Sequence, residues 1–193
     1  MLSRRNIIFG RENSVRLDRH SRPAAKRYMQ VPNSRTVKEK IAKQNIKGNI
    51  YAWKYLENSR NYPGWNFTAD KNGCESLLEL LYLMKHCKWS SKKEIITSIP
   101  TENQIKVPNN QRGLAKWKSI SKLIFSSKKD IEKNHWKIIE GVNEIEIQFG
   151  ENKLVELEKA IIGIPNREGD FAISNNPYDD NNIFYIWWNL EKE

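Results

Sequence analysis

The chain has 193 residues, 38% of them hydrophobic and 29% charged, and its formal net charge is +10. These values permit one folded domain with a modest core, plus an extension. They exclude helices that span a membrane, because no run approaches the roughly 18 apolar residues that a span requires. We expect a cytoplasmic protein. Import into mitochondria is the alternative, because residues 1–11 contain three arginines and no acidic residue.

Positive charge is concentrated at one end of the chain. Residues 1–60 contain 15 Lys and Arg against 4 Asp and Glu, a net charge of +11. Residues 61–193 contain 18 against 19, a net charge of −1. All seven tryptophans lie between Trp53 and Trp188. A basic, apolar-poor arm therefore precedes a nearly neutral, tryptophan-rich body, and this asymmetry indicates a polyanionic partner.

Residues 1–33 show no helical or strand periodicity and contain Pro23 and Pro32, so they predict an extended arm that becomes ordered against a partner. A short helix is predicted next. Thr36 and Glu39 match a capping box, and Gly48 matches a helix end. The lysines of this helix share one face, and its narrow apolar edge is expected to dock on the body or on a partner. These residues are Lys40, Lys43 and Lys47 on the basic face and Val37 and Ile41 on the apolar edge.

The body is predicted to begin near Asn49. Tyr62 to Trp65 form a Pro-Gly turn, and a strand follows over 65–69. Apolar residues at helical spacing predict a well-covered helix that begins at about Lys71 or Gly73 and ends at His86. A second helix is predicted over 151–162, ended by Gly163 and Pro165. The remaining predicted strands are 94–99, 105–107, 117–125, 135–139, 144–149, 170–174 and 183–190.

This order of elements predicts an α+β fold with a mostly antiparallel sheet and two main helices, preceded by the basic arm and its short helix. We expect two parts. Residues 1–48 form the basic arm with the short helix, and residues 49–193 form a single α+β globular domain.

The basic residues are the first candidate site. Lys and Arg at this density neutralise phosphates and release counterions, which gives affinity that depends on salt but not on sequence. Four aromatic residues among them are candidates for stacking on unpaired bases: Tyr28, Tyr51, Trp53 and Tyr55. The alternatives are an acidic protein surface as the partner, or a solvated tail without a specific role. The candidate nucleic-acid contacts are Arg16, Arg19, Arg22, Lys26, Arg27, Arg35, Lys40, Lys43 and Lys47.

Two other sets of residues are of types that can bind metals or transfer protons. His86, Cys87, Cys74 and His135 lack the paired spacing of a structural zinc site, so we expect no metal. The two cysteines lie about 20 Å apart if one helix joins them, which excludes a disulfide between them. Carboxylates flank the last two predicted strands and would suit Mg²⁺ or acid–base chemistry only if the turn brings them together: Glu168, Asp170, Asp179 and Asp180.

Phosphate-binding loops, nucleophile elbows and zinc-protease motifs are absent from the sequence, so we expect no cofactor and no enzymatic activity. The final predicted strand is apolar on both faces. Such a strand is either central and covered on both sides, or it presents aromatic residues to a partner. In the second case Tyr185 and Trp187 are the natural anchors.

The leading hypothesis is a non-enzymatic binding protein whose basic arm contacts nucleic acid, RNA or a ribonucleoprotein rather than a sequence-specific DNA site. The alternative is a protein-interaction module of the immunity or antitoxin kind. It would bind a partner protein through its arm or its aromatic C-terminal strand.

Overall fold

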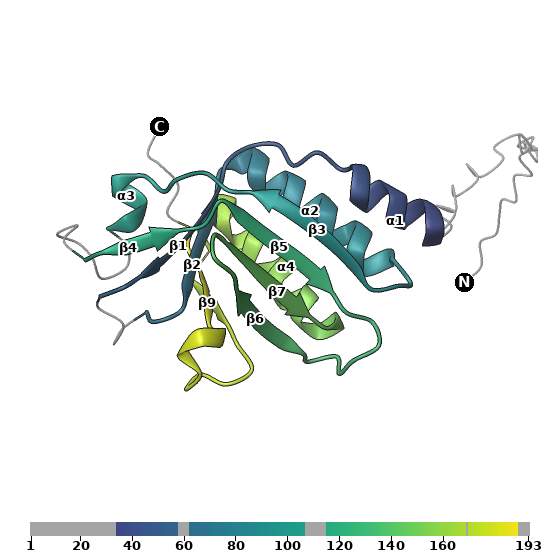
Figure 1. The fold of residues 1–193 in the computed structure, drawn as a ribbon. Helices are drawn as coiled ribbons and strands as arrows, with labels where there is room; N and C mark the ends of the chain where they lie inside the picture. The colour runs from purple at the N-terminus through teal and green to yellow at the C-terminus, as the bar shows by residue number, and fades with distance from the viewer. Residues whose placement is uncertain (1–33, 58–61, 107–114, 169, 189–193) are drawn as a thin grey trace, which may run out of the picture. The chain divides into compact units, whose positions relative to one another are not determined.

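A computed structural model describes residues 34–57, 62–106, 115–168 and 170–188 (Figure 1). Its described strands form a five-stranded sheet, in the order β4-β1-β2-β9-β8, and a four-stranded sheet, in the order β3-β5-β7-β6. Pairing is antiparallel except between β2 and β9 and between β5 and β7. The α+β class with mostly antiparallel strands is therefore confirmed.

The bounds of the elements are as follows. The helices are α1 (Ser34–Lys43), α2 (Lys71–His86), α3 (Glu102–Ile105), α4 (Glu151–Asn166) and the 3-10 helix η1 (Asp180–Asn182). The strands of the five-stranded sheet are β1 (Ile50–Tyr55), β2 (Trp65–Ala69), β4 (Trp117–Ser119), β8 (Phe171–Ile173) and β9 (Phe184–Ile186). Those of the four-stranded sheet are β3 (Ser91–Ile96), β5 (Lys122–Ser127), β6 (Trp136–Glu140) and β7 (Glu144–Phe149).

The main core lies between the four-stranded sheet and the helices. In Figure 1, α2 and α4 lie behind this sheet. Leu123 and Phe125 of β5 are fully buried against the helices, together with Leu81 of α2 and Leu157 of α4. The apolar spacing that predicts α2 and α4 thus marks the faces that bury this core.

A second, smaller cluster covers the other face of the five-stranded sheet. It gathers Tyr51, Trp53 and Tyr55 from β1 with Ile105 of α3 and with Trp187. The Tyr55 hydroxyl donates a hydrogen bond to the carbonyl of Ile105 at 2.6 Å. Because both faces of β1 are covered, this strand lacks the alternation of apolar and polar residues by which a half-exposed strand is recognised.

The predicted helix from Thr36 to Gly48 is wrong at both ends, because α1 begins at Ser34 and ends at Lys43. Thr36 therefore lies inside the helix and does not cap it. The helix ends earlier than predicted because the residues after Lys43 form hydrogen bonds with α2 instead. The Gln44 side chain donates to the Ser76 carbonyl at 3.1 Å, and the Lys47 N–H donates to the Ser76 hydroxyl at 3.0 Å.

Gly48 does have a left-handed conformation, with φ of 80°, but it serves the contact with α2. A Cβ at this position would lie 2.2 Å from the Gly73 nitrogen, near the Asp70 side chain that caps α2. The apolar edge of α1 docks on the body, because Val37 and Ile41 are buried in the main core.

Three predicted strands are wrong. The strand predicted over 94–99 is β3, which begins and ends three residues earlier, at Ser91 and Ile96. The residues predicted as a strand over 105–107 include the end of α3, whose start is fixed by a capping box between Thr101 and Gln104; Val107 lies outside the described residues. The single strand predicted over 117–125 is two strands, β4 and β5, in different sheets. The chain changes sheets at Ser121, whose N–H donates to the Asn143 carbonyl at 3.1 Å.

The predicted end of the second helix at Ile162 is also wrong, because α4 continues to Asn166 with Pro165 inside it. The helix closes on Arg167, which has a left-handed conformation, and the Glu168 N–H donates to the Gly163 carbonyl at 3.0 Å. This is the Schellman arrangement, in which the orphan carbonyls of the last turn find donors beyond the helix.

Glu140 links the two sheets. It stands at the end of β6 and accepts hydrogen bonds from Lys54 Nζ at 2.6 Å, Lys118 Nζ at 3.1 Å and Trp65 Nε1 at 3.0 Å, all from the five-stranded sheet. Burial acts to raise the pKa of this carboxyl group. The hydrogen bonds from Lys54, Lys118 and Trp65 outweigh that effect, so the pKa is lowered.

We expect Glu140→Gln to lower the free energy of unfolding at pH 7 by about 2 kcal/mol, because the charged acceptor of three hydrogen bonds is lost. Since the folded-state pKa lies below the unfolded-state value, this stabilisation is complete above the unfolded-state pKa and is lost as the pH falls through the folded-state pKa. Urea denaturation of the wild type and of Glu140→Gln between pH 7 and pH 3 measures the difference in their free energies of unfolding. This difference should shrink on acidification, while the exposed control Glu168→Gln should change the free energy of unfolding little at any pH. A difference that stays constant would contradict the role of Glu140.

Candidate nucleic-acid interface

The predicted basic contacts fall into two groups. Arg16, Arg19, Arg22, Lys26 and Arg27 lie outside the described residues. The other four belong to α1 and to the segment that follows it, and all four are exposed. They are Arg35, Lys40, Lys43 and Lys47.

The exposed lysines of α1 border a groove against α2. Lys40 and Lys43 line a hollow of about 440 Å³, together with Glu39 and Glu79. Lys47 lines a separate hollow of about 210 Å³ beside α2. Arg35 Nε lies 3.6 Å from the Glu39 carboxylate. Positive charge on α1 is therefore interspersed with carboxylates.

The aromatic residues proposed for base stacking are not available in the folded body. Tyr51, Trp53 and Tyr55 are buried in the second cluster, so the prediction that they offer stacking surfaces is wrong. Their position among basic residues in the sequence does not carry over to the surface, because β1 is covered on both faces. Tyr28 lies outside the described residues.

The aromatic residues of β9 serve the core. Phe184 and Ile186 are buried in the main core, and Trp187 is buried on the opposite side. The Trp187 indole N–H donates to the Asn66 Oδ1 at 3.0 Å, and Tyr185 is half-buried beside it. The strand is therefore covered on both sides, and the indole of Trp187 is not exposed for a partner.

The described histidine and cysteine residues form no metal-binding cluster. Among the described residues, no three His, Cys, Asp or Glu side chains are grouped in a way that would hold a metal ion. Burial, together with the charges of Asp70 and Glu75, raises the pKa of the Cys74 thiol to about 12, so the group is protonated at neutral pH. His86 is exposed, and its Nδ1 lies 2.8 Å from the Tyr82 carbonyl.

The acidic residues near the last strands have separate structural roles. Asp179 accepts hydrogen bonds from the Asn181 N–H and the Asn182 side chain, which is the capping arrangement of a turn. Burial raises the pKa of Asp170, against the opposing effect of a hydrogen bond from the Trp188 backbone. Asp180 and Glu168 are exposed.

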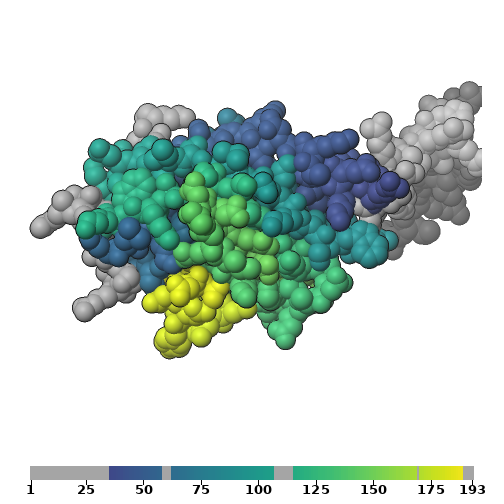
Figure 2. All heavy atoms as spheres, in the orientation of Figure 1, coloured from purple at the N-terminus to yellow at the C-terminus, as the bar shows by residue number. Residues whose placement is uncertain are grey.

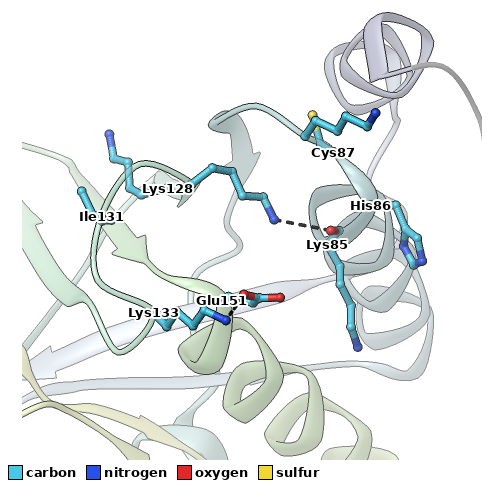
Figure 3. A pocket seen from close by; sticks show the side chains of 9 residues that line it. Lys85, His86, Cys87, Lys128, Ile131, Lys133 and Glu151 are labelled. Atoms are coloured by element: carbon cyan, nitrogen blue, oxygen red, sulfur yellow. Dashed lines mark hydrogen bonds and ion pairs between the residues drawn. The ribbon is translucent and has the colours of Figure 1, made fainter.

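The structure also brings together a lysine cluster that the sequence did not predict. A hollow of about 320 Å³ lies between the end of α2, the loop from β5 to β6 and the start of α4 (Figure 3). We call it the lysine pocket. It is lined by Lys85, His86, Cys87, Lys88, Lys128, Lys129, Ile131, Lys133 and Glu151.

Contacts within and around the lysine pocket neutralise only part of its charge. Lys133 pairs with Glu151 at 3.4 Å, and Lys85 pairs with Glu158 at 3.0 Å. Lys129 Nζ donates to the carbonyl of Lys85 at 3.4 Å (Figure 3). For Lys88 and Lys128, the described parts of the chain provide no ion pair.

Backbone contacts hold the pocket in shape. The Lys129 N–H donates to the Ser90 hydroxyl at 3.0 Å, and the Asn152 N–H donates to the Lys133 carbonyl at 2.9 Å. Gly150 lies so close to the loop that a Cβ there would be 2.4 Å from the Glu132 carbonyl oxygen. The loop between β5 and β6 is thus fixed to the turn after α2 on one side and to α4 on the other.

Helix α1 packs against α2 and β3. Figure 2 shows the purple atoms of α1 beside the teal atoms of the α2–β3 region. The sequence contains two pairs of the lysines that line the pocket, Lys85/Lys88 and Lys128/Lys129, about 40 residues apart. The folded chain brings the two pairs together, so the site forms only in the tertiary structure.

No protein-family model, curated protein or solved structure matches the chain. Within the described residues, no helix combines the length and apolar character needed to cross a membrane.

Proposed function

We propose that the protein is a non-enzymatic binding protein whose basic N-terminal region contacts nucleic acid, RNA or a ribonucleoprotein, in the cytoplasm. The observation that carries the proposal is the charge asymmetry, with a net charge of +11 over residues 1–60 and −1 over the rest. Electrostatic attraction of this kind acts on any phosphate backbone, and so it supports binding without sequence specificity.

The exposure of the basic residues on and after α1 supports the proposal. Lys40, Lys43 and Lys47 are exposed, while Val37 and Ile41 attach the helix to the core. The helix therefore presents its lysines from a rigid base.

Filter binding of the full chain to a single-stranded RNA across a salt series tests the proposal. Each phosphate contact contributes about −0.7 to the slope of log K against log salt concentration. We expect a slope of about −4 or steeper, equivalent to roughly six contacts. Affinity without salt dependence, or no binding at low salt, would overturn the proposal.

A charge-neutralised variant locates the contacts. Replacing the five basic residues of the arm by glutamine should reduce the magnitude of the slope by about 3.5, since each lost contact removes about 0.7. The matched control, Lys137→Gln with Lys159→Gln, removes exposed lysines of the body and should leave the slope unchanged. The residues replaced in the arm are Arg16, Arg19, Arg22, Lys26 and Arg27.

The alternative is a protein-interaction module of the immunity or antitoxin kind that binds an acidic protein surface through the arm. The route through the aromatic strand is disfavoured, because Trp187 is buried and its indole N–H is already bonded to Asn66. Purification from the native source separates the two functions: a stoichiometric protein partner without nucleic acid would favour the alternative.

A further inference from the structure

We propose that the lysine pocket and Trp89 form a second contact site on the body, specific for single-stranded nucleic acid. The lysines would contact backbone phosphates, and the indole of Trp89 would stack on an unpaired base. This inference rests on the proposed function, and it names both the class of nucleic acid and a site outside the basic arm.

The charge of the pocket supports phosphate binding. Its lining has five lysines and one glutamate, although residues 61–193 as a whole are nearly neutral. Lys88 and Lys128 have no ion pair within the described residues, so their ammonium groups are available to an anion. The hollow of about 320 Å³ is large enough for a phosphate group with part of its sugar.

Trp89 supplies the second element. It follows Lys88 directly, in the turn between α2 and β3, and 62% of its surface is exposed. Most other tryptophans of the described body are buried or half-buried. An exposed aromatic ring beside lysines is the combination that binds single strands, because bases stack on the ring while the cations follow the backbone.

The turn that carries Trp89 is fixed at both sides. On one side, Cys87 is buried, and its N–H donates to the Met84 carbonyl at 3.3 Å. Ser90 on the other side accepts the hydrogen bond from the Lys129 N–H. The backbone that carries the exposed indole is therefore fixed directly after Lys88, which lines the pocket, and a fixed backbone lowers the entropy cost of binding.

The two elements together discriminate between polyanions. A duplex offers phosphates to the lysines but no unpaired base to the indole. An acidic protein surface offers carboxylates but no base. Only a single strand engages both, so Trp89 contributes to affinity for a single strand and not for the other two ligands.

The test uses the full chain and three probes: a labelled 12-nucleotide single-stranded RNA, the duplex of the same sequence, and poly-L-glutamate. Trp89→Ala should weaken binding to the single strand by about fivefold or more, which is the lower end of base–aromatic stacking. It should leave binding to the duplex and to poly-L-glutamate unchanged. Trp89→Phe should retain part of the affinity.

The lysines are tested separately. Lys88→Ala with Lys128→Ala should reduce the magnitude of the salt slope by about 1.4, equivalent to two phosphate contacts. Lys71→Ala is the matched control, since Lys71 is an exposed lysine at the opposite end of α2. Tyr178→Ala, at a residue with 91% exposure, is the control for removal of an exposed ring. Neither control should change affinity or slope.

Three results would overturn the inference. If the wild type binds RNA with the expected salt slope but the Trp89 and lysine variants bind equally well, the second site does not exist and the proposed function stands. If Trp89→Ala leaves single-strand affinity unchanged while the lysine variant weakens all three probes alike, the pocket is a general polyanion or acidic-protein surface. If the wild type binds neither nucleic acid, both proposals are wrong.

Discussion

Gly150→Ala is expected to lower the free energy of unfolding by about 3 kcal/mol or more, the upper range for forcing extra volume into a packed site. The reason is steric. A Cβ at Gly150 would lie 2.4 Å from the Glu132 carbonyl oxygen and 2.5 Å from that of Lys133, and both are backbone atoms that cannot rotate away. The backbone conformation itself is ordinary, with φ of −84°, so strain in φ plays no part.

Urea denaturation monitored by tryptophan fluorescence measures this effect. Gly141→Ala is the matched control, because its Cβ would meet the Cγ of Glu144, a flexible side chain, at 2.9 Å. A Gly150→Ala protein as stable as the wild type would show that the loop between β5 and β6 shifts freely. The lysine pocket would then be less rigid than its hydrogen bonds indicate.

The second large effect is expected for Asn66→Ala, which should lower the free energy of unfolding by about 3 kcal/mol. Asn66 is fully buried in β2, and its Oδ1 accepts the indole N–H of Trp187 at 3.0 Å. Alanine would leave this N–H buried without an acceptor and would remove the packing of the amide. Losing both interactions costs more free energy of unfolding than losing one ordinary exposed hydrogen bond.

A double-mutant cycle with Trp187→Phe isolates the hydrogen bond. Phenylalanine has no N–H, so Asn66→Ala should cost about 1 kcal/mol less in that background. Thermal and urea unfolding of the four proteins give the coupling energy. Strictly additive effects would contradict the hydrogen bond as the source of the stability.

Elements with a clear period were predictable from the sequence. The helix from Lys71 to His86 begins at one of its two predicted starts and ends at the predicted residue, because the apolar spacing marks its buried face. The hairpin of β6 and β7 was predicted within two residues, since its second strand alternates between apolar and charged residues. In both cases local pattern and burial point to the same structure.

Elements whose conformation depends on distant partners were not predictable. The period-2 pattern from Trp117 to Phe125 continues through the point where the chain changes sheets, so the break at Ser121 leaves no trace in the sequence. The end of α1 at Lys43 is set by hydrogen bonds to Ser76, more than 25 residues further on. β1 was not predicted because it is buried on both faces.

The same distinction applies to the candidate site. The exposure of Lys40 and Lys43 followed from their position relative to the apolar edge of α1, whereas Lys47 is exposed in the segment after the helix. The stacking role of Tyr51, Trp53 and Tyr55 was wrong because the composition around a residue does not determine its burial. The lysine pocket was missed because three separate segments form it. Glutamates near these lysines in the sequence also cancel their positive charge when the net charge of a segment is counted.

The position of β9 has a consequence for shortened chains. This strand lies between β2 and β8 and pairs in parallel with Trp65 to Phe67, although more than 100 residues separate the two segments. A chain cut before Phe184 by an early stop codon or a protease would leave the β2 edge unpaired and its aromatic residues uncovered. Open apolar edges recruit strands from other chains. Such a truncation would therefore produce an aggregation-prone protein rather than a shorter working one.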